Sequence, residues 1–159
     1  MSRPRFTREE LIGAPEPGFS LSRRVRMQDV DAAGIIFYSR ALEIMSDALF
    51  SALEHYGYPG TRIFNEEHFV TPVKHCEVHY LRPLRFEDRV RAGMVLGHVG
   101  ETDFTFGCRI YNETRDEVSV VGQVHQVCVD TRSFKRVPFT DEFREVLEKI
   151  KGRGSPGTG

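Results

Sequence analysis

The chain has 159 residues, a length that fits one domain able to bury a core without help from disulfides or metal. Its 22 basic and 23 acidic side chains give a formal net charge of -1, which argues against a nucleic-acid-binding protein because such proteins normally carry a basic excess. Every apolar run is far shorter than the roughly 20 residues that a helix needs to cross a bilayer, so no membrane span is predicted.

The two ends of the chain differ in composition from its middle. Residues 1–19 are rich in Pro, Gly and charge, and we predict a flexible arm there. The final segment KGRGSPGTG (151–159) has no apolar side chain and predicts a disordered tail, which leaves residues 20–150 as the single domain.

The N-terminus has no apolar stretch behind its basic residues, which argues against a secretory signal. An odd number of cysteines fits a reducing compartment, so the cytoplasm is the expected location.

A long helix is predicted after the first strand. Residues 20–27 alternate enough to form a half-buried edge strand. From residue 36 to residue 56, apolar side chains recur with helical spacing and charged side chains occupy the gaps. Gly57 is well placed to end this helix, and Pro59 follows it. The broad apolar face of the helix requires a large, flat partner.

Four further strands and a short helix are predicted after the long helix. The strands span residues 69–81, 89–99, 103–112 and 118–130, with an irregularity expected near Pro72, and the helix spans 139–150. The last three strands can pair as an antiparallel meander with short connections. A curved antiparallel sheet wrapped around one long central helix is the α+β arrangement that buries the helix best. One sheet over one helix leaves exposed edges, so we expect an oligomer.

Two aspartates, Asp29 and Asp31, stand between the first strand and the long helix, in the segment MQDVDAAGIIFY. One interpretation is structural, with one Asp capping the helix and the other in a solvated turn. The other interpretation is catalytic. Gly34 lets the backbone approach another molecule, the free N–H groups at the helix start can hold an oxyanion, and Asp31 can face the carbonyl carbon. A carboxylate opposite an oxyanion site is what hydrolysis of an activated acyl group needs.

The segment DVDAAGIIFYSRALEIMSDA resembles the signature of the 4-hydroxybenzoyl-CoA thioesterase branch of the hotdog-fold family, in which D-x-D-x-x-G-[IV]-[IV]-[FWY]-[YH] leads into the central helix. TPVKHCEVHYLRPLRFEDRVRAG resembles the second and third strands of that family, and VDTRSFKRVPF its closing strand with a proline exit. The similarity runs from about residue 20 to residue 150. It implies a hotdog fold and hydrolysis of an acyl thioester, a reaction that needs no metal or redox cofactor.

The resemblance also implies functions for single residues. The second aspartate of the signature, Asp31, is the catalytic carboxylate, acting as nucleophile or as base for water. Tyr38 starts the central helix and presents its backbone N–H to the thioester oxygen. Gly34 is the signature glycine, and Asp29 is assigned to support rather than chemistry. Related short-chain acyl-CoA thioesterases have histidine where this chain has Tyr38, whereas the aromatic-acyl enzymes have tyrosine, which favours an aromatic or bulky acyl group.

The coenzyme A site departs from the family pattern. The hydroxybenzoyl enzymes hold the nucleotide phosphates with basic residues before the fourth strand, but the corresponding segment HVGETDF has no Arg or Lys. Phosphate contacts would have to come from elsewhere in this chain or from a neighbouring subunit, and the candidates are Arg82, Arg85, Arg89, Arg132, Lys135 and Arg136. The carrier is therefore open between coenzyme A and an acyl carrier protein.

Metal and thiol chemistry are the other candidates. His75 and His79 share one face of a predicted strand, with His125 across the sheet, but no Cys or carboxylate completes a familiar ligand set. Asp29 and Asp31 offer too few oxygens for a hard cation, so no metal is expected. The cysteines are expected to be small buried side chains rather than catalytic thiols; they are Cys76, Cys108 and Cys128.

Aromatic residues could contribute to an acyl site. Tyr56, Tyr58 and Phe64 follow the long helix and could line such a site or anchor the core and a loop. Phe104 and Phe106 are expected to pack in the core.

Together these features predict a thioester hydrolase acting on acyl-CoA or an acyl carrier protein, assembled as a homodimer or homotetramer. The main alternative is a non-catalytic hotdog subunit that binds an acyl group, and the intact Asp31 and Gly34 argue against it. A dehydratase of the same fold is a weaker alternative. Such enzymes use a histidine near the central helix, and none lies between Asp31 and His55.

Overall fold

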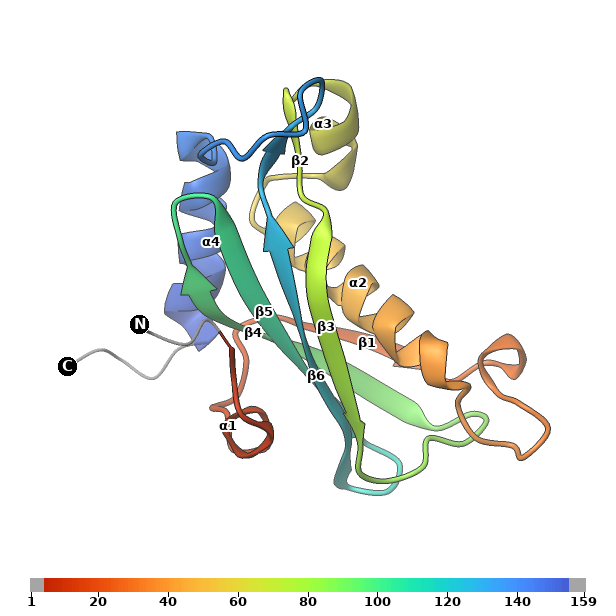
Figure 1. Cartoon of the computed structure of the whole chain (residues 1–159). Helices are drawn as coiled ribbons and strands as arrows, with labels where there is room; N and C mark the ends of the chain where they lie inside the picture. The colour runs from red at the N-terminus through yellow and green to blue at the C-terminus, as the bar shows by residue number, and fades with distance from the viewer. Residues whose placement is uncertain (1–4, 155–159) are drawn as a thin grey trace.

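The computed structural model describes residues 5–154, with side chains up to Lys151. A curved antiparallel sheet wraps around one long helix, so the predicted α+β arrangement is confirmed (Figure 1). A 3-10 turn (Met27–Asp29) precedes the long helix α2. The helices are α1 (Arg8–Ile12), α2 (Tyr38–His55), α3 (Gly60–Asn65) and α4 (Asp141–Gly154). The strands are β1 (Ser20–Arg24), β2 (Phe69–Val70), β3 (Val73–Tyr80), β4 (Arg89–Val99), β5 (Asp103–Asn112), β6 (Glu117–Val127) and β7 (Val129–Asp130).

The large sheet has the strand order β1-β4-β5-β6-β3, and every neighbouring pair is antiparallel. Strands β4, β5 and β6 form the predicted meander, in which Met94 lies opposite Cys108 and Cys108 opposite Gly122. Strands β1 and β3 form the two edges. The short strands β2 and β7 pair separately, at the end of the molecule that is uppermost in Figure 1.

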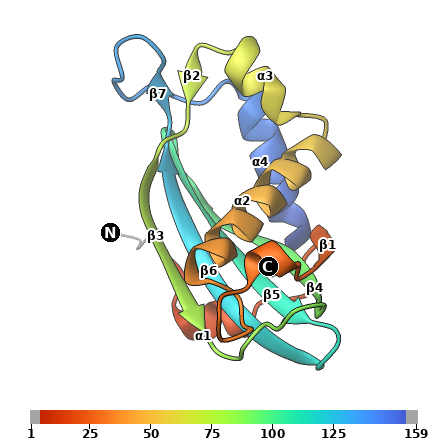
Figure 2. The same ribbon diagram turned by 90° about the vertical axis from the view of Figure 1, so that its right-hand side faces the viewer.

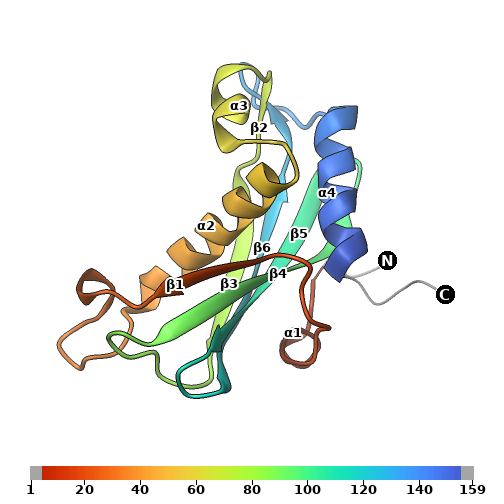
Figure 3. The same ribbon diagram turned by 180° about the vertical axis from the view of Figure 1, so that it is seen from behind.

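The concave face of the sheet holds helices α2 and α4, which lie on the same side in Figure 2. One stripe of α2 is buried because its apolar residues recur every three or four positions. The buried residues of this stripe are Ala41, Ile44, Met45, Ala48, Leu49, Ala52 and Leu53. Helix α4 crosses the far end of β4 (Figure 3) and adds Phe143 and Leu147 to the same core. The apolar face that the sequence predicts for α2 is therefore the buried face in the structure, and the charged residues Glu43, Asp47 and Glu54 are exposed on the helix.

The convex face carries the N-terminal segment that we expected to be a flexible arm. The Phe6 N–H donates to Gln123 Oε1 at 2.8 Å, and Gln123 Nε2 donates back to the Phe6 carbonyl at 2.7 Å. Leu11 in α1 is 0% exposed and lies over Gly107, where a Cβ would collide with its side chain. The segment thus packs on the sheet through contacts more than 90 residues apart in sequence, which composition cannot reveal. Residues 1–4 of the expected arm lie outside the described residues.

Several predicted boundaries differ from the structure. The first strand ends at Arg24, because the chain turns into the 3-10 segment, and the expected strand over 69–81 is divided before Val73 by the irregularity foreseen at Pro72. The last strand is divided between β6 and β7. Helix α3 was not predicted at all. Helix α4 extends into the expected disordered tail, of which residues 155–159 lie outside the described part.

Across residues 5–154, no helix combines the length and the apolar character that a membrane crossing requires.

Candidate active site

The segment before α2 folds into a tight turn that exposes Asp31. The Asp31 N–H donates to the Ile35 carbonyl at 3.0 Å, and the Gly34 N–H donates to the Asp31 carbonyl at 2.9 Å. Gly34 has a φ of +76°, a left-handed conformation that glycine adopts without the steric cost of a Cβ. Flanking residues Val30 and Ile36 form a β-bridge that closes the turn. The sequence therefore places an exposed carboxylate at a fixed position just ahead of the helix.

The carboxylate of Asp31 is held by the backbone of its own turn. Its Oδ1 atom accepts a hydrogen bond from the Ala33 N–H at 2.8 Å. This bond orients the carboxylate, and a carboxylate has further lone pairs that can approach a carbonyl carbon or a water molecule. Asp31 is exposed, so a substrate can reach it from solvent.

Asp29 has the surroundings of a structural residue. It is 4% exposed, its Oδ2 accepts the Arg26 N–H at 2.8 Å, and the same oxygen pairs with the Arg23 guanidinium. Its backbone carbonyl accepts the N–H of Phe37, the residue immediately before α2, at 2.8 Å. Asp29 thus ties β1, the 3-10 turn and the helix start together, which fits the supporting function expected for it.

Helix α2 begins at Tyr38, as the motif predicts, rather than at residue 36. Its N-cap is Phe37, whose side chain makes no capping hydrogen bond. The first N–H groups of an α-helix have no intrahelical acceptor, so the Tyr38 N–H can donate to a ligand, and the helix dipole favours negative charge at this point. Tyr38 itself is 68% exposed, and its carbonyl accepts a hydrogen bond from the hydroxyl of Tyr80 at the end of β3.

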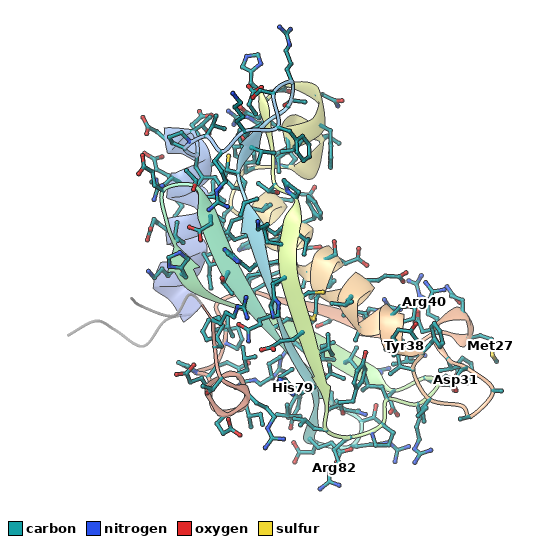
Figure 4. All side chains as sticks on the ribbon, viewed as in Figure 1. Met27, Asp31, Tyr38, Arg40, His79 and Arg82 are labelled. Atoms are coloured by element: carbon teal, nitrogen blue, oxygen red, sulfur yellow. The ribbon has the colours of Figure 1, made fainter. Side chains whose placement is uncertain are left out.

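Asp31 and Tyr38 line one open pocket of about 450 Å³. Figure 4 shows both residues at the start of α2, with Arg82 beyond the end of β3. The pocket is lined by two segments, and its residues are Asp31, Ile35, Ile36, Phe37, Tyr38, Tyr80, Leu81, Arg82 and Pro83. Apolar and aromatic side chains therefore surround a single carboxylate and the start of a helix.

The six candidate phosphate-binding residues are divided between the two ends of the molecule. Arg82 lines the pocket, and Arg85 lies next to it, in a β-bridge with Ile35. Arg89 begins β4 and its N–H donates to Thr114. The other three residues are exposed on the loop after β7, at the opposite end of the sheet from Asp31 (Figures 1 and 4); they are Arg132, Lys135 and Arg136.

A histidine–carboxylate cluster lies on the convex face, away from the pocket. Asp103 Oδ1 is 3.1 Å from His98 Nε2, and Asp103 Oδ2 is 2.9 Å from His125 Nε2. Burial raises the pKa of Asp103, but the hydrogen bonds with both histidines outweigh it and the net pKa is lowered. His75 faces His125 across the sheet. Among residues 5–154, no group of three or more His, Cys, Asp or Glu side chains is arranged to hold a metal ion.

The cysteines only partly follow the expectation that all three are buried. Cys108 and Cys128 are buried, and burial raises the pKa of their thiols to about 12 and about 11. Cys76 is exposed, so the expectation was wrong for this residue. The physical reason is that Cys76 belongs to β3, an edge strand with a neighbouring strand on one side only.

The aromatic residues after α2 do not line the pocket of Asp31. Tyr58 is buried, and its hydroxyl donates to Glu67 at 2.6 Å, while Phe64 in α3 is 71% exposed. Phe104 and Phe106 are buried in the core, with ring centroids 6.3 Å apart. Phe37 and Tyr80 are pocket aromatics that the sequence analysis did not assign to the site. Strand alternation puts Tyr80 on the same side of β3 as Val78, which packs against the core.

Known proteins resemble this chain over most of its length. The family model of the thioesterase-like superfamily matches residues 25–147. The 1,4-dihydroxy-2-naphthoyl-CoA hydrolase of Thermosynechococcus vestitus is 27% identical over 141 residues, which cover 89% of this chain and 96% of that protein. The enzyme of the same name from Nostoc punctiforme is 29% identical over 131 residues, covering 82% of this chain and 86% of the relative.

Solved structures share the fold. A 1,4-dihydroxy-2-naphthoyl-CoA thioesterase from Synechocystis superposes with a TM-score of 0.77 at 20% identity, covering 81% of this chain and 94% of that one. A DHNA-CoA thioesterase from Staphylococcus aureus gives a TM-score of 0.76 at 15% identity, covering 84% and 90%. The hotdog fold that the resemblance implied is confirmed. Since the family model spans the turn of Asp31, helix α2 and every strand from β2 to β7, the chain belongs to the thioesterase-like superfamily.

Proposed function

We propose that this protein hydrolyses acyl-CoA thioesters with an aromatic acyl group, and that Asp31 is the catalytic carboxylate. The observation that carries the proposal is that the exposed Asp31 and the first residue of α2, Tyr38, line the same pocket. Relatives that match most of this chain are named as hydrolases of 1,4-dihydroxy-2-naphthoyl-CoA, a thioester with an aromatic acyl group.

In this mechanism the thioester carbonyl oxygen accepts the Tyr38 N–H, and the carbonyl carbon faces Asp31. Either the carboxylate attacks the carbon directly, or it removes a proton from a water molecule that attacks. In both routes the carbonyl oxygen gains negative charge, which the N–H and the helix start stabilise. The carbon–sulfur bond then breaks and coenzyme A leaves as its thiol. A direct attack also requires water to hydrolyse the acyl–Asp31 anhydride, so both routes end in a carboxylic acid.

The turn geometry explains why Gly34 belongs to this mechanism. Its positive φ allows the chain to reverse within the three residues that separate Asp31 from Ile35. Open space surrounds the position where a Cβ would be, so a substituent there would cost backbone strain rather than a steric clash. Gly34 therefore sets the position of Asp31 without touching the acyl group.

The acyl group is expected to contact the aromatic wall of the pocket. The rings of Phe37 and Tyr38 are tilted against each other with centroids 4.6 Å apart, and both side chains are exposed. Exposed aromatic surface at the mouth of a pocket favours a flat, apolar ligand. Arg82, which lines the pocket, is the first candidate to bind the phosphates of coenzyme A in this proposal. The reaction needs no cofactor other than the coenzyme A carried by the substrate.

The active assembly in this proposal is a homodimer, or a homotetramer built from it, joined through the open edge of β3. An edge strand presents unpaired backbone groups, and apolar side chains are exposed at both ends of β3, at Val73 and Tyr80. Antiparallel pairing of two copies would bring the loop that starts at Thr131, which is bonded to His68, toward the partner's pocket. The distant basic residues could then serve the neighbouring site. A monomer at micromolar concentration in sedimentation experiments would contradict this assembly.

The test is thiol release from a panel of aryl-, short-chain and long-chain acyl-CoA thioesters and acyl-carrier-protein thioesters. Wild type should hydrolyse the aryl-CoA substrates fastest, and Asp31→Asn should reduce kcat by a factor on the order of a hundred or more. Asp47→Asn, which changes an exposed carboxylate of α2, is the matched control and should keep full activity. Turnover of the carrier-protein substrate alone would make this a carrier-protein thioesterase. Tight acyl-CoA binding without turnover would favour a non-catalytic binding module.

A further inference from the structure

Tyr80 connects the open edge of the sheet to the start of the central helix. It is the last residue of β3, and its hydroxyl donates a hydrogen bond to the backbone carbonyl of Tyr38. Its side chain is 48% exposed and lines the same pocket as Asp31. No other side-chain hydrogen bond joins β3 to the first turn of α2 among the bonds found in residues 5–154.

The bond acts on the residue that presents the oxyanion donor. The Tyr38 carbonyl already faces the N–H one helical turn further on, so Tyr80 supplies a second donor to it. Two donors fix the plane of the peptide that follows Tyr38 and therefore restrict rotation about the backbone of Tyr38. Since the N–H of Tyr38 lies on the other side of the same Cα, its direction is restricted as well. A misdirected donor loses most of its value, because hydrogen bonds weaken steeply as they bend.

The hydroxyl has to be protonated to serve in this way. Burial raises the pKa of Tyr80, and the nearby Tyr38 raises it further, so the phenol remains a donor at neutral pH. If the phenol were ionised, the phenolate oxygen and the Tyr38 carbonyl oxygen would face each other as two acceptors with no proton between them. The surroundings of Tyr80 therefore favour the form that the geometry requires.

We propose that Tyr80 is a positioning residue of the thioesterase site, whose hydroxyl holds the first turn of α2 so that the Tyr38 N–H points at the developing oxyanion. This inference rests on the proposed function, since it concerns the same pocket. Tyr80 does not exchange a proton or form a bond with the substrate. Its effect on the reaction is transmitted through Tyr38.

A double-mutant cycle tests this transmission. Tyr80→Phe keeps the ring in the pocket wall and removes the hydroxyl. Tyr38→Pro removes the N–H, and proline is compatible with the first position of a helix. The preceding Phe37, with φ -67° and ψ 138°, already has the extended backbone that a residue before proline adopts. Tyr111→Phe, which removes a hydroxyl bonded to Asp116 outside the pocket, is the matched control.

Tyr80→Phe should lower kcat on an aryl-CoA substrate about tenfold, with KM changed less than about twofold, whereas Tyr111→Phe should leave both unchanged. In the Tyr38→Pro background, the same Tyr80→Phe change should alter kcat less than about twofold, because the donor that it positions is gone. An equal loss in both backgrounds, or a kcat of Tyr80→Phe equal to that of wild type, would overturn the proposal. The wild-type rate on aryl-CoA is measured in the same series. If wild type hydrolyses aryl-CoA, these outcomes overturn only the role of Tyr80, whereas no hydrolysis by wild type would overturn the proposed function itself.

Discussion

Two carboxylates of the molecule, Asp31 and Asp103, have very different surroundings. Asp31 stands exposed at the start of α2, and Ala33 of its own turn donates to it. Asp103 lies on the convex face between His98 and His125, which hydrogen-bond with its two oxygens. By residue type alone, the carboxylate with two histidines looks like the stronger catalytic candidate. Its position argues the reverse, because the pocket opens at Asp31.

In our proposal, hydrogen-bond partners and access to solvent distinguish the reactive carboxylate, Asp31, from the structural carboxylate, Asp103. The partners of Asp103 are fixed on neighbouring strands, and breaking them would leave half-buried polar groups unpaired. Asp31 keeps free lone pairs beside a helix start that attracts negative charge. We therefore expect changes at the mouth of α2 to lower activity and changes on the convex face to lower stability.

The largest expected effect is a loss of kcat on changing Tyr38, at the start of α2. Tyr38→Pro removes one oxyanion donor, so kcat should fall about 100- to 1,000-fold, or about 2.7–4 kcal/mol of transition-state stabilisation. Tyr38→Ala removes the ring but keeps the N–H, and it should retain most of kcat while raising KM for aryl substrates. Steady-state kinetics of the two variants measure this. Equal kcat values for them would contradict the assignment of the backbone N–H.

The next effect concerns the convex face. Leu11→Ala should lower the free energy of unfolding by about 2–3 kcal/mol, because Leu11 is fully buried against Gly107 and the sheet. Its matched control in the same helix is Ile12→Ala, since Ile12 is 36% exposed and should cost little. Urea unfolding measures both variants. A loss of kcat/KM in folded Leu11→Ala, at a temperature well below its transition, would break the separation between the two faces.

The smallest effect depends on pH. The lowered pKa of Asp103 means that its stabilisation is present above the unfolded pKa, about 3.9 for Asp, and is lost as pH falls through the folded pKa. Asp103→Asn should therefore reduce the free energy of unfolding by about 1–2 kcal/mol at pH 7 and by much less near pH 3. Urea unfolding at both pH values, with Asp47→Asn as control, measures the difference. A difference that grows toward acid pH would contradict the role given to Asp103.

Much of the fold could be predicted because periodic patterns determined it locally. The apolar spacing of α2 and the strict alternation of β5 each identified an element, and the bounds of β4 and β5 were predicted correctly. Helix α3 was missed because its six residues are too few to show a helical period. The docking of Phe6 on Gln123 was missed because a contact between residues 117 positions apart leaves no local pattern.

The candidate site was predicted as far as it lies in one segment. The motif brought Asp29, Asp31, Gly34 and Tyr38 together, and the structure places all four in or beside the turn before α2. Tyr80 and Arg82 join the pocket from a different segment, which only the tertiary fold brings near. The basic residues were chosen by charge alone, so the sequence could not separate those near the pocket from those at the far end.

The most direct test measures activity and stability together in Asp31→Asn and Asp103→Asn. Our account predicts that Asp31→Asn loses a factor on the order of a hundred or more in kcat on aryl-CoA, while its free energy of unfolding stays within about 0.5 kcal/mol of wild type. Asp103→Asn should show the opposite pattern at pH 7. Full activity in Asp31→Asn, or a comparable loss of kcat in folded Asp103→Asn, would contradict the assignment of catalysis to the mouth of α2.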